Sequence, residues 1–410
     1  MRRPTILFMN RVYPPVRGAT GRVLQDLAVS FAREGWHVTV ISSGPKAGEE
    51  RQDGVRILRV KGAVRPSGAR AYFWIWFKML LLALRLKGRH ILVTMTDPPL
   101  LILVGQFVAK LKRSRHINWC QDLYPDVMPA LGFRMPVLLM RWFRRLRIKA
   151  MKRCDKVIVC GRCMVKHLTQ EGVDAQKIAM VANWPDMELT DPEMVDVTGV
   201  PYQEPDSDIV RPFEKQVKAE SRFRVLYAGN MGLAHPIETI LAAAEIFEEQ
   251  GSDIEFVFVG DGARFDYIAA VRSEKCLDNI RLLPFQPVSR LREIMESGDV
   301  HLITMKEDAA GLVVPCKLYS ALAVARPSIF VGPVQSEVAK VIRDFSTGLV
   351  VATDDVDNLV NAIKHFRESG EAWFEAHRGA VQAREVFTPQ KSIEAWMDCA
   401  WDVVKDDLET

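Results

Sequence analysis

Residues 10–28 read NRVYPPVRGATGRVLQDLA and decide the fold, because they connect an apolar run at residues 5–9 to a helical pattern at residues 23–33. The run is typical of a buried strand, and the later pattern places apolar residues on one side of a helix. Gly18 and Gly21 lie in the turn between them. Glycine lets a backbone approach a ligand closely, and a helix N-terminus suits phosphate. Because neither G-x-G-x-x-G nor a Walker A motif follows, the loop is either a phosphate site or an ordinary strand–helix turn.

The same alternation of strands and helices extends over most of the chain. Short apolar runs separated by amphipathic patterns predict βαβ units and parallel sheets. Residues 186–221 interrupt the alternation, since they are rich in Asp, Glu and Pro and lack apolar periodicity. We therefore predict an α/β protein with a Rossmann-like domain at residues 1–185, a linker, and a second Rossmann-like domain at residues 222–387. The predicted strands are 5–9, 37–42, 55–60, 92–95, 117–119 and 156–160, then 223–227, 255–259, 280–283, 300–304 and 328–331.

The composition is that of a reduced globular protein. Its 55 basic and 51 acidic residues nearly balance over 410 residues, so charge alone does not indicate a nucleic-acid partner. Seven scattered cysteines are typical of a cytosolic protein. The pair Cys160 and Cys163 lacks the two further ligands that a structural zinc site needs. No stretch offers about 18 clean apolar residues, so no membrane-spanning helix is expected.

Three loops of the second half also follow predicted strands. In open parallel sheets, ligands bind at the carboxyl ends of the strands. A lysine at a helix start, after a loop with glycine and proline, is a natural partner for a diphosphate. The sequence therefore predicts a phosphate-bearing ligand in a cleft between the two domains. The candidate residues in these loops are Gly229, Asn230 and Gly232, then Gly260 and Gly262, then Pro315 and Lys317.

Several motifs, taken in their order along the chain, resemble those of one enzyme family. They are Tyr13-Pro-Pro15 with Gly18 to Gly21, Gln121-Asp-Leu-Tyr-Pro-Asp126, Ala182-Asn-Trp184, Ala228-Gly-Asn-Met-Gly232, Gly260-Asp-Gly262, Phe285-Gln-Pro287 and Pro315-Cys-Lys317. With these motifs the chain resembles the family 4 retaining glycosyltransferases of the GT-B fold. It is most similar to the colanic-acid-type subgroup, which builds bacterial exopolysaccharides and O-antigens.

The resemblance implies a GT-B fold in which two Rossmann-like domains face a cleft and a helix at residues 388–410 returns to the N-terminal domain. It implies transfer of a hexosyl or N-acetylhexosaminyl group, with retention, from a nucleotide sugar to a polyprenyl-diphosphate-linked saccharide. The expected donor is a UDP-sugar, and neither a cofactor nor a metal is expected. The enzyme would act on the inner face of the cell membrane, as a peripheral cytoplasmic protein that helps build exopolysaccharide or lipopolysaccharide. A UDP-sugar 2-epimerase of the same fold and an inactive nucleotide- or lipid-binding scaffold are the alternatives.

The resemblance also assigns roles to individual residues. Lys317 and backbone N–H groups would bind the diphosphate. Asp122 would lie near the reacting sugar or acceptor, with a helix cap as the alternative. The two glutamates typical of the family correspond to Leu312 and Ser320 here, so the donor contacts must differ at these positions. Glu337 would either contact sugar hydroxyls or only begin a helix. The predicted donor site is completed by Gln286, Ser320 and Glu337.

Residues 134–153 read RMPVLLMRWFRRLRIKAMKR and carry eight positive charges without an acidic residue. A basic helix with Trp and Phe among its apolar residues predicts an element that lies on anionic lipid. The alternative is a buried helix with a solvated basic rim. Nucleic acid is not an expected partner, because no aromatic stacking module accompanies the charge. The predicted membrane or acceptor residues are Trp74, Trp76, Arg141, Trp142, Arg144, Arg145 and Arg147.

Overall fold

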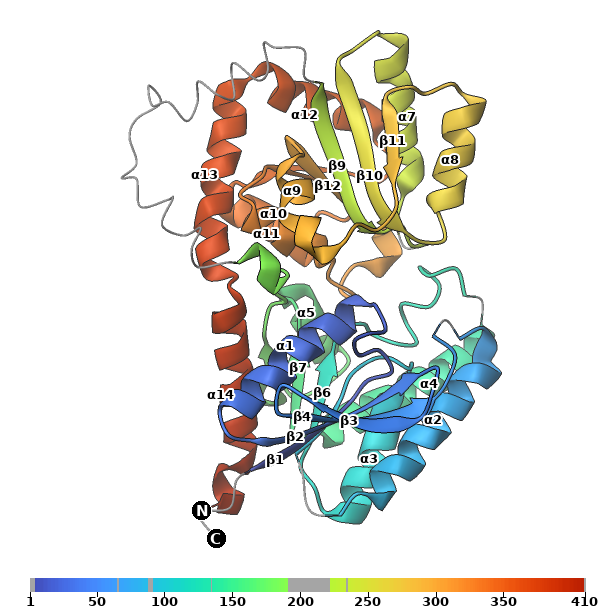
Figure 1. The fold of residues 1–410 in the computed structure, drawn as a ribbon, viewed down its shortest axis with the longest axis vertical. Coiled ribbons are helices and arrows are strands. Elements are labelled where there is room, and N and C mark those ends of the chain that lie inside the picture. Colours follow the sequence, from blue (N-terminus) through green and yellow to red (C-terminus); the bar gives the residue numbers. More distant parts are fainter. Residues whose placement is uncertain are drawn as a thin grey trace.

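The chain folds into two parallel-sheet domains, one above the other in Figure 1. This arrangement confirms the predicted fold class. The computed structural model describes residues 4–64, 66–87, 91–133, 135–190, 222–233 and 235–408, with side chains described up to residue 405. Most of the predicted linker, residues 191–221, lies outside these ranges.

An eight-stranded sheet forms the centre of the N-terminal domain. Its strands are β1 (Thr5–Met9), β2 (His37–Gly44), β3 (Gly48–Gln52), β4 (Val55–Lys61), β5 (Ile91–Thr94), β6 (His116–Cys120), β7 (Lys156–Val159) and β8 (Ile178–Met180). The order across the sheet is β3-β4-β2-β1-β5-β6-β7-β8, and β3 alone among them pairs antiparallel. β1 pairs with β2 on one side and β5 on the other, so the strand order reverses there. Ligands of such sheets bind at that reversal. The criterion of apolar runs misses β3, because all five of its residues are exposed.

A six-stranded, all-parallel sheet forms the centre of the C-terminal domain. Its strands are β9 (Phe223–Asn230), β10 (Ile254–Asp261), β11 (Ile280–Leu283), β12 (Val300–Thr304), β13 (Ser328–Val331) and β14 (Gly348–Val351). The order is β11-β10-β9-β12-β13-β14, so the reversal lies between β9 and β12. Asn230 ends β9, and Lys317 begins α10 (Lys317–Ala323) after the segment that follows β12.

Helices cover both faces of each sheet (Figure 1). Those of the N-terminal domain are α1 (Ala19–Arg33), α2 (Gly68–Arg85), α3 (Leu101–Lys112), α4 (Val137–Arg153) and α5 (Arg162–Gln170). Those that follow β9 are α7 (Ile237–Glu249), α8 (Phe265–Glu274), α9 (Leu291–Glu296), α10 (Lys317–Ala323), α11 (Glu337–Phe345), α12 (Val356–Glu368), α13 (Gly370–Val386) and α14 (Pro389–Leu408). In the N-terminal domain, α2 and α3 share one apolar core with the sheet, while α1 shares another.

Helix α14 belongs to the N-terminal core although it follows the C-terminal domain in sequence. Figure 1 shows it continuing below α13, alongside the N-terminal sheet. Trp396 is fully buried, and its ring centroid lies 5.9 Å from that of Phe8 and 5.3 Å from that of Trp119. Loss of a buried tryptophan side chain costs about 3–5 kcal/mol. The helix therefore ties the two domains together.

The domains also touch directly. The backbone N–H of Leu123 donates to the Leu312 carbonyl at 2.9 Å, and Asp122 forms an isolated antiparallel bridge with Val313. Apolar residues of both segments share one buried cluster. These contacts bring the loop after β6 against the loop before α10, which positions the candidate site.

Candidate active site

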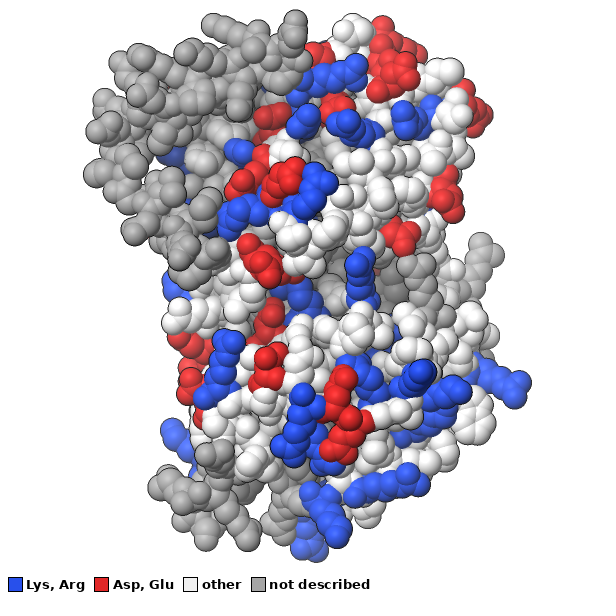
Figure 2. Space-filling view, in the orientation of Figure 1, with Lys and Arg blue, Asp and Glu red and all other residues white. Residues whose placement is uncertain are grey.

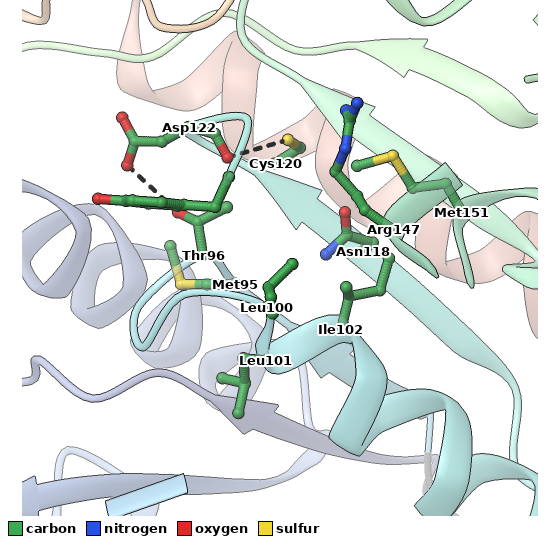
Figure 3. A pocket seen from close by; sticks show the side chains of 11 residues that line it. Met95, Thr96, Leu100, Leu101, Ile102, Asn118, Cys120, Asp122, Arg147 and Met151 are labelled. Carbon is green, nitrogen blue, oxygen red and sulfur yellow. Dashed lines mark hydrogen bonds between the residues drawn. The ribbon is translucent and has the colours of Figure 1, made fainter. Parts of the chain in front are cut away.

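Asp122 lies at the contact between the domains, directly after β6. The Thr96 hydroxyl donates to Asp122 Oδ2 at 3.4 Å (Figure 3). Desolvation by the surrounding protein, together with the negative charge of Asp97, raises the pKa of Asp122 to about 6. A carboxyl group with this pKa changes its protonation close to neutral pH, as acid–base groups of active sites do.

A small cavity extends from Asp122 into the N-terminal domain (Figure 3). Thr96 and Asn118 contribute polar groups to its wall, as do Tyr124 and Arg147, and about half of the lining residues are apolar. The apolar lining favours the neutral form of the carboxyl group, which accounts for the direction of the pKa shift. The apolar lining residues are Met95, Leu100, Leu101, Ile102 and Met151.

Lys317 begins α10 and reaches back to the end of β9. Its ammonium donates to the Asn230 carbonyl at 3.1 Å. The same Nζ lies 3.5 Å from Nε2 of His235 and 4.7 Å from the centroid of the Tyr227 ring. The fold therefore brings together two predicted donor residues, Asn230 and Lys317, that are 87 positions apart.

The glycines after β9 and β10 make this approach possible. Gly229 and Gly260 have φ values of 118° and 146°, which disfavour any residue with a side chain. A Cβ on Gly229 would lie 3.2 Å from Cε of Lys317, and a Cβ on Gly260 would lie 2.1 Å from the Gly229 carbonyl oxygen. Gly262 likewise faces backbone, since its Cβ would lie 2.6 Å from the Met231 oxygen.

The glycines of the first loop have a local explanation. A Cβ on either Gly18 or Gly21 would lie 2.8 Å from Cγ1 of Val12. Small residues at both positions therefore let α1 begin directly against the loop that precedes it. Their predicted contact with phosphate remains a prediction.

Arg22, the residue after this loop, is a candidate that sequence reasoning missed. Its guanidinium donates to the backbone oxygens of Trp184 at 2.8 Å and Pro185 at 2.9 Å. These bonds, together with ion pairs to Asp26 at 3.2 Å and Asp186 at 3.7 Å, hold the guanidinium at the first turn of α1. The position of Arg22 in the sequence could have identified it. A basic residue directly after a glycine loop, at the start of a helix, suits an anionic ligand.

Charged residues of both domains affect the pKa of the Cys316 thiol. Burial raises its pKa, and the charge of Asp122 adds to that rise. Arg22 and Lys317 act in the opposite direction on the same pKa. The backbone of Asp122 also bridges Val313, in the loop that leads into α10, so the segment with this carboxyl group lies against the loop that ends at Lys317.

The remaining donor candidates lie around this point with different surroundings. Pro315 is buried directly before Cys316, and Ser320 is half-buried within α10. The Gln286 side chain lies in the loop after β11 and donates to the Pro284 carbonyl at 2.9 Å. A Cβ on Gly232 would lie 3.0 Å from Nδ2 of Asn230, so this glycine leaves room for that amide.

Glu337 is occupied by a contact between the domains. Its carboxylate accepts hydrogen bonds from the Arg162 backbone N–H at 2.6 Å and from Arg162 Nε at 2.8 Å. Arg162 also binds Asp344 at 2.7 Å. Glu337 begins α11, as one of the two interpretations expected, and its carboxylate holds α5 against α11.

Comparison with known proteins agrees with this geometry. Residues 18–184 match the family model described as "Glycosyl transferase 4-like domain", and residues 210–378 match "Glycosyl transferases group 1". The two models follow one another and together cover most of the chain. This chain is a family 4 glycosyltransferase of the GT-B fold.

Three relatives illustrate the range of similarity. WbjE of Pseudomonas aeruginosa, described as a probable glycosyltransferase, is 23% identical over 297 residues, which cover 71% of this chain and 70% of WbjE. WcaI of Escherichia coli strain K12, described as a colanic acid biosynthesis glycosyl transferase, is 24% identical over 267 residues, covering 63% of this chain and 61% of WcaI. The crystal structure of Anabaena HepE in complex with UDP superposes with a TM-score of 0.68 at 14% identity, over 97% of this chain and all of that one.

Leu312, one of the two positions expected to differ from the family's glutamates, lies at the contact between the domains. Leu312 is buried, and its carbonyl accepts the bond from Leu123 that joins the domains. An apolar side chain at this position therefore packs into the contact between the domains.

The basic helix of the glycosyltransferase is α4, and its residues divide into two groups. Arg147 is 1% exposed, because it lies between Asp126 at 3.1 Å and Glu171 at 2.6 Å. The prediction that Arg147 faces a membrane or an acceptor is therefore wrong. Arg144 also forms an ion pair with Asp126, although about half of its side chain is exposed.

Other cations of α4 do face outward. A surface groove, here called the α4 groove, is lined by Arg145, Ile148, Lys149, Lys152 and Arg153. Figure 2 shows Lys and Arg gathered toward the lower right, where Figure 1 places α2 and α4. Trp142 on α4 is 52% exposed, and Trp74 on α2 is 48% exposed. Trp76 is partly buried against the core beneath α2, and its predicted contact with a membrane or acceptor remains a prediction.

Within the described residues, no group of His, Cys, Asp or Glu has the arrangement of a metal site. Cys160 and Cys163 are free and buried, and they pack into the apolar cluster at the contact between the domains. In the part of the chain that the structure describes, no helix is long and apolar enough to cross a bilayer.

Proposed function

We propose that this glycosyltransferase moves a sugar, with retention, from a UDP-sugar to a polyprenyl-diphosphate-linked saccharide during the synthesis of a bacterial surface polysaccharide. The observation that carries the proposal is that Asp122 of the N-terminal domain bridges Val313, in the loop that leads to Lys317, while Lys317 reaches back to the end of β9 at Asn230. Cations there can bind a diphosphate, and the carboxyl group lies on the side of the domain that would hold the acceptor. The names of WbjE and WcaI and the UDP in the HepE structure support the choice of reaction and donor.

The reaction balances without a further reactant. The bond between the anomeric carbon and the donor diphosphate breaks, and a bond forms to an acceptor hydroxyl on the face that the diphosphate leaves. The hydroxyl proton passes to the departing diphosphate. Lys317 would stabilise the negative charge that grows on that group, and Asp122 would orient the acceptor or the reacting sugar. Neither a metal nor a cofactor has a part in this scheme.

The α4 groove supports a place on the inner, cytoplasmic face of the membrane. Its four cations have neighbouring exposed apolar side chains, among them Leu138 and Trp142. Each Lys or Arg near an anionic surface contributes about 1 kcal/mol. Four such residues therefore contribute about 4 kcal/mol. This is enough to bind the protein peripherally to the membrane that carries a lipid-linked acceptor.

The donor half of the proposal is tested by thermal unfolding with UDP, GDP, ADP or dTDP. A nucleotide at 100 times its dissociation constant stabilises by about 2.7 kcal/mol. Of the four nucleotides, only UDP should raise the melting temperature. The radiolabelled sugar of a UDP-sugar should then be transferred to a lipid-linked acceptor. If no nucleotide has an effect at millimolar concentration, the proposed donor is wrong and an inactive scaffold becomes the better explanation.

The membrane half is tested by sedimentation with vesicles that contain phosphatidylglycerol. Glutamine at all four cations of the α4 groove should release the protein from the vesicles. A matched control removes four exposed cations of the C-terminal domain and should bind as the wild type does; these are Arg272, Lys275, Arg281 and Arg290. Equal binding of both variants would contradict the membrane proposal.

A further inference from the structure

His235 connects Lys317 to the body of the C-terminal domain. It lies in the loop between β9 and α7, and its ring is half-buried. Nδ1 is 2.7 Å from the Thr304 carbonyl oxygen, and Nε2 is 3.5 Å from Nζ of Lys317. A single ring therefore bridges the end of β12 and the lysine at the start of α10.

The two contacts decide which ring nitrogen carries the proton. Nδ1 also lies 3.1 Å from the Thr304 hydroxyl, but a carbonyl oxygen can only accept, so the shorter contact to the Thr304 carbonyl requires a proton on Nδ1. A neutral imidazole has one N–H, which leaves Nε2 with its lone pair. That lone pair faces an ammonium group, which can only donate. The arrangement is thus a chain of hydrogen bonds from Lys317 through His235 to Thr304.

The surroundings keep the ring neutral. Burial lowers the pKa of His235 to about 3, and the positive charges of Lys317 and Lys306 act in the same direction. The Thr304 carbonyl opposes them, and the Tyr227 ring packs edge-on at 6.1 Å without a charge. At neutral pH the ring therefore remains an acceptor toward Lys317.

We propose that His235 is the positioning residue of Lys317, and that it holds the ammonium where a leaving diphosphate will lie. Two N–H groups of Lys317 point to Asn230 and His235, so the third can donate to a phosphate oxygen. The Tyr227 ring and the space left by Gly229 confine the rest of the side chain. Because it assumes a diphosphate leaving group, this inference rests on the proposed function.

The first test reads the ring without any substrate. The chain has 8 histidines, so selective ¹⁵N labelling gives a countable spectrum, and His235→Gln identifies the signals of His235. We expect a proton on Nδ1, an unprotonated Nε2, and a changed Nε2 shift in Lys317→Ala. A proton on Nε2, or an unchanged shift, overturns the inference even if the enzyme transfers sugar.

The second test uses two substitutions that separate the two contacts. The amide of His235→Asn can still donate to Thr304 but does not reach Lys317, whereas His235→Gln can place an oxygen near the former Nε2. The Asn variant should lose about tenfold in kcat with little change in the donor KM, and Gln should restore part of the loss. Thermal unfolding of each variant checks that the fold is retained.

A double-mutant cycle then asks whether His235 acts through Lys317. In a Lys317→Ala background, His235→Asn should change the residual rate less than about twofold. An equal loss in both backgrounds means that His235 acts independently, and overturns the inference. Failure of UDP to stabilise the wild type instead contradicts the proposed function, so the two failures are distinguishable.

Discussion

Asp122→Asn tests directly whether the folded state disfavours the ionised form of a carboxyl group at the contact between the domains. The substitution keeps the shape of the side chain and removes its ability to ionise. The pKa of Asp122 rises from an ordinary 3.8 to about 6, because ionisation is disfavoured beside the cavity and near Asp97. The free energy of unfolding of the wild type is therefore lower when this carboxyl group is ionised.

The sign and size follow from the shift. The folded state binds the proton more tightly than the unfolded state, so the favourable contribution is complete below pH 3.8 and is lost as pH rises through about 6. A shift of about two pKa units corresponds to about 3 kcal/mol, and partial solvent contact reduces the expected loss to about 1–3 kcal/mol. Asn cannot ionise, so its stability relative to the wild type should increase by that amount between pH 4 and pH 7.

Urea unfolding of both proteins, followed at several pH values, measures this difference. Comparing the two proteins at each pH cancels the titration of groups that do not interact with Asp122. A difference that does not change with pH would refute the reasoning. Sugar transfer by the wild type should also follow the protonation of a group with a pKa near 6, and the Asn variant should lose that pH dependence.

Three further substitutions test separate parts of the structure. Lys317→Ala should lower kcat by about 10²–10³-fold while the melting temperature stays near that of the wild type; near-normal turnover would exclude Lys317 from the site. Arg147→Met should destabilise by about 3–5 kcal/mol in urea unfolding, because the partly buried Glu171 and the buried Asp126 both lose this cation, and Asp126 keeps only the half-exposed Arg144. The control Arg141→Met, on the exposed face of α4, should change stability by less than about 0.5 kcal/mol, and similar losses for both would contradict the burial of Arg147. Glu337→Gln should lower stability by about 1–3 kcal/mol without changing the donor KM in initial-rate kinetics, whereas a raised KM would favour contact with the donor sugar.

Much of the fold could be predicted because its signal is local. Buried parallel strands such as β1 and β10 are continuous apolar runs, and turns with glycine mark their ends. β3 gave no such signal, because an exposed strand at a sheet edge is held by backbone hydrogen bonds to β4 and needs no apolar side chain. Candidate loops were predictable for the same reason, since ligands of open sheets bind where strands end.

The sequence by itself determined the two parallel-sheet domains, the glycine loops and the family motifs, because periodicity and turn chemistry act over a few neighbouring residues. Only the tertiary structure decided how residues far apart act together. In the folded protein, Arg147 of α4 is buried between Asp126 and Glu171, while Trp142 on the same helix is exposed. It also brought His235 within reach of Lys317, 82 positions later. Burial and pairing depend on which strands lie side by side, and local sequence does not encode that choice residue by residue.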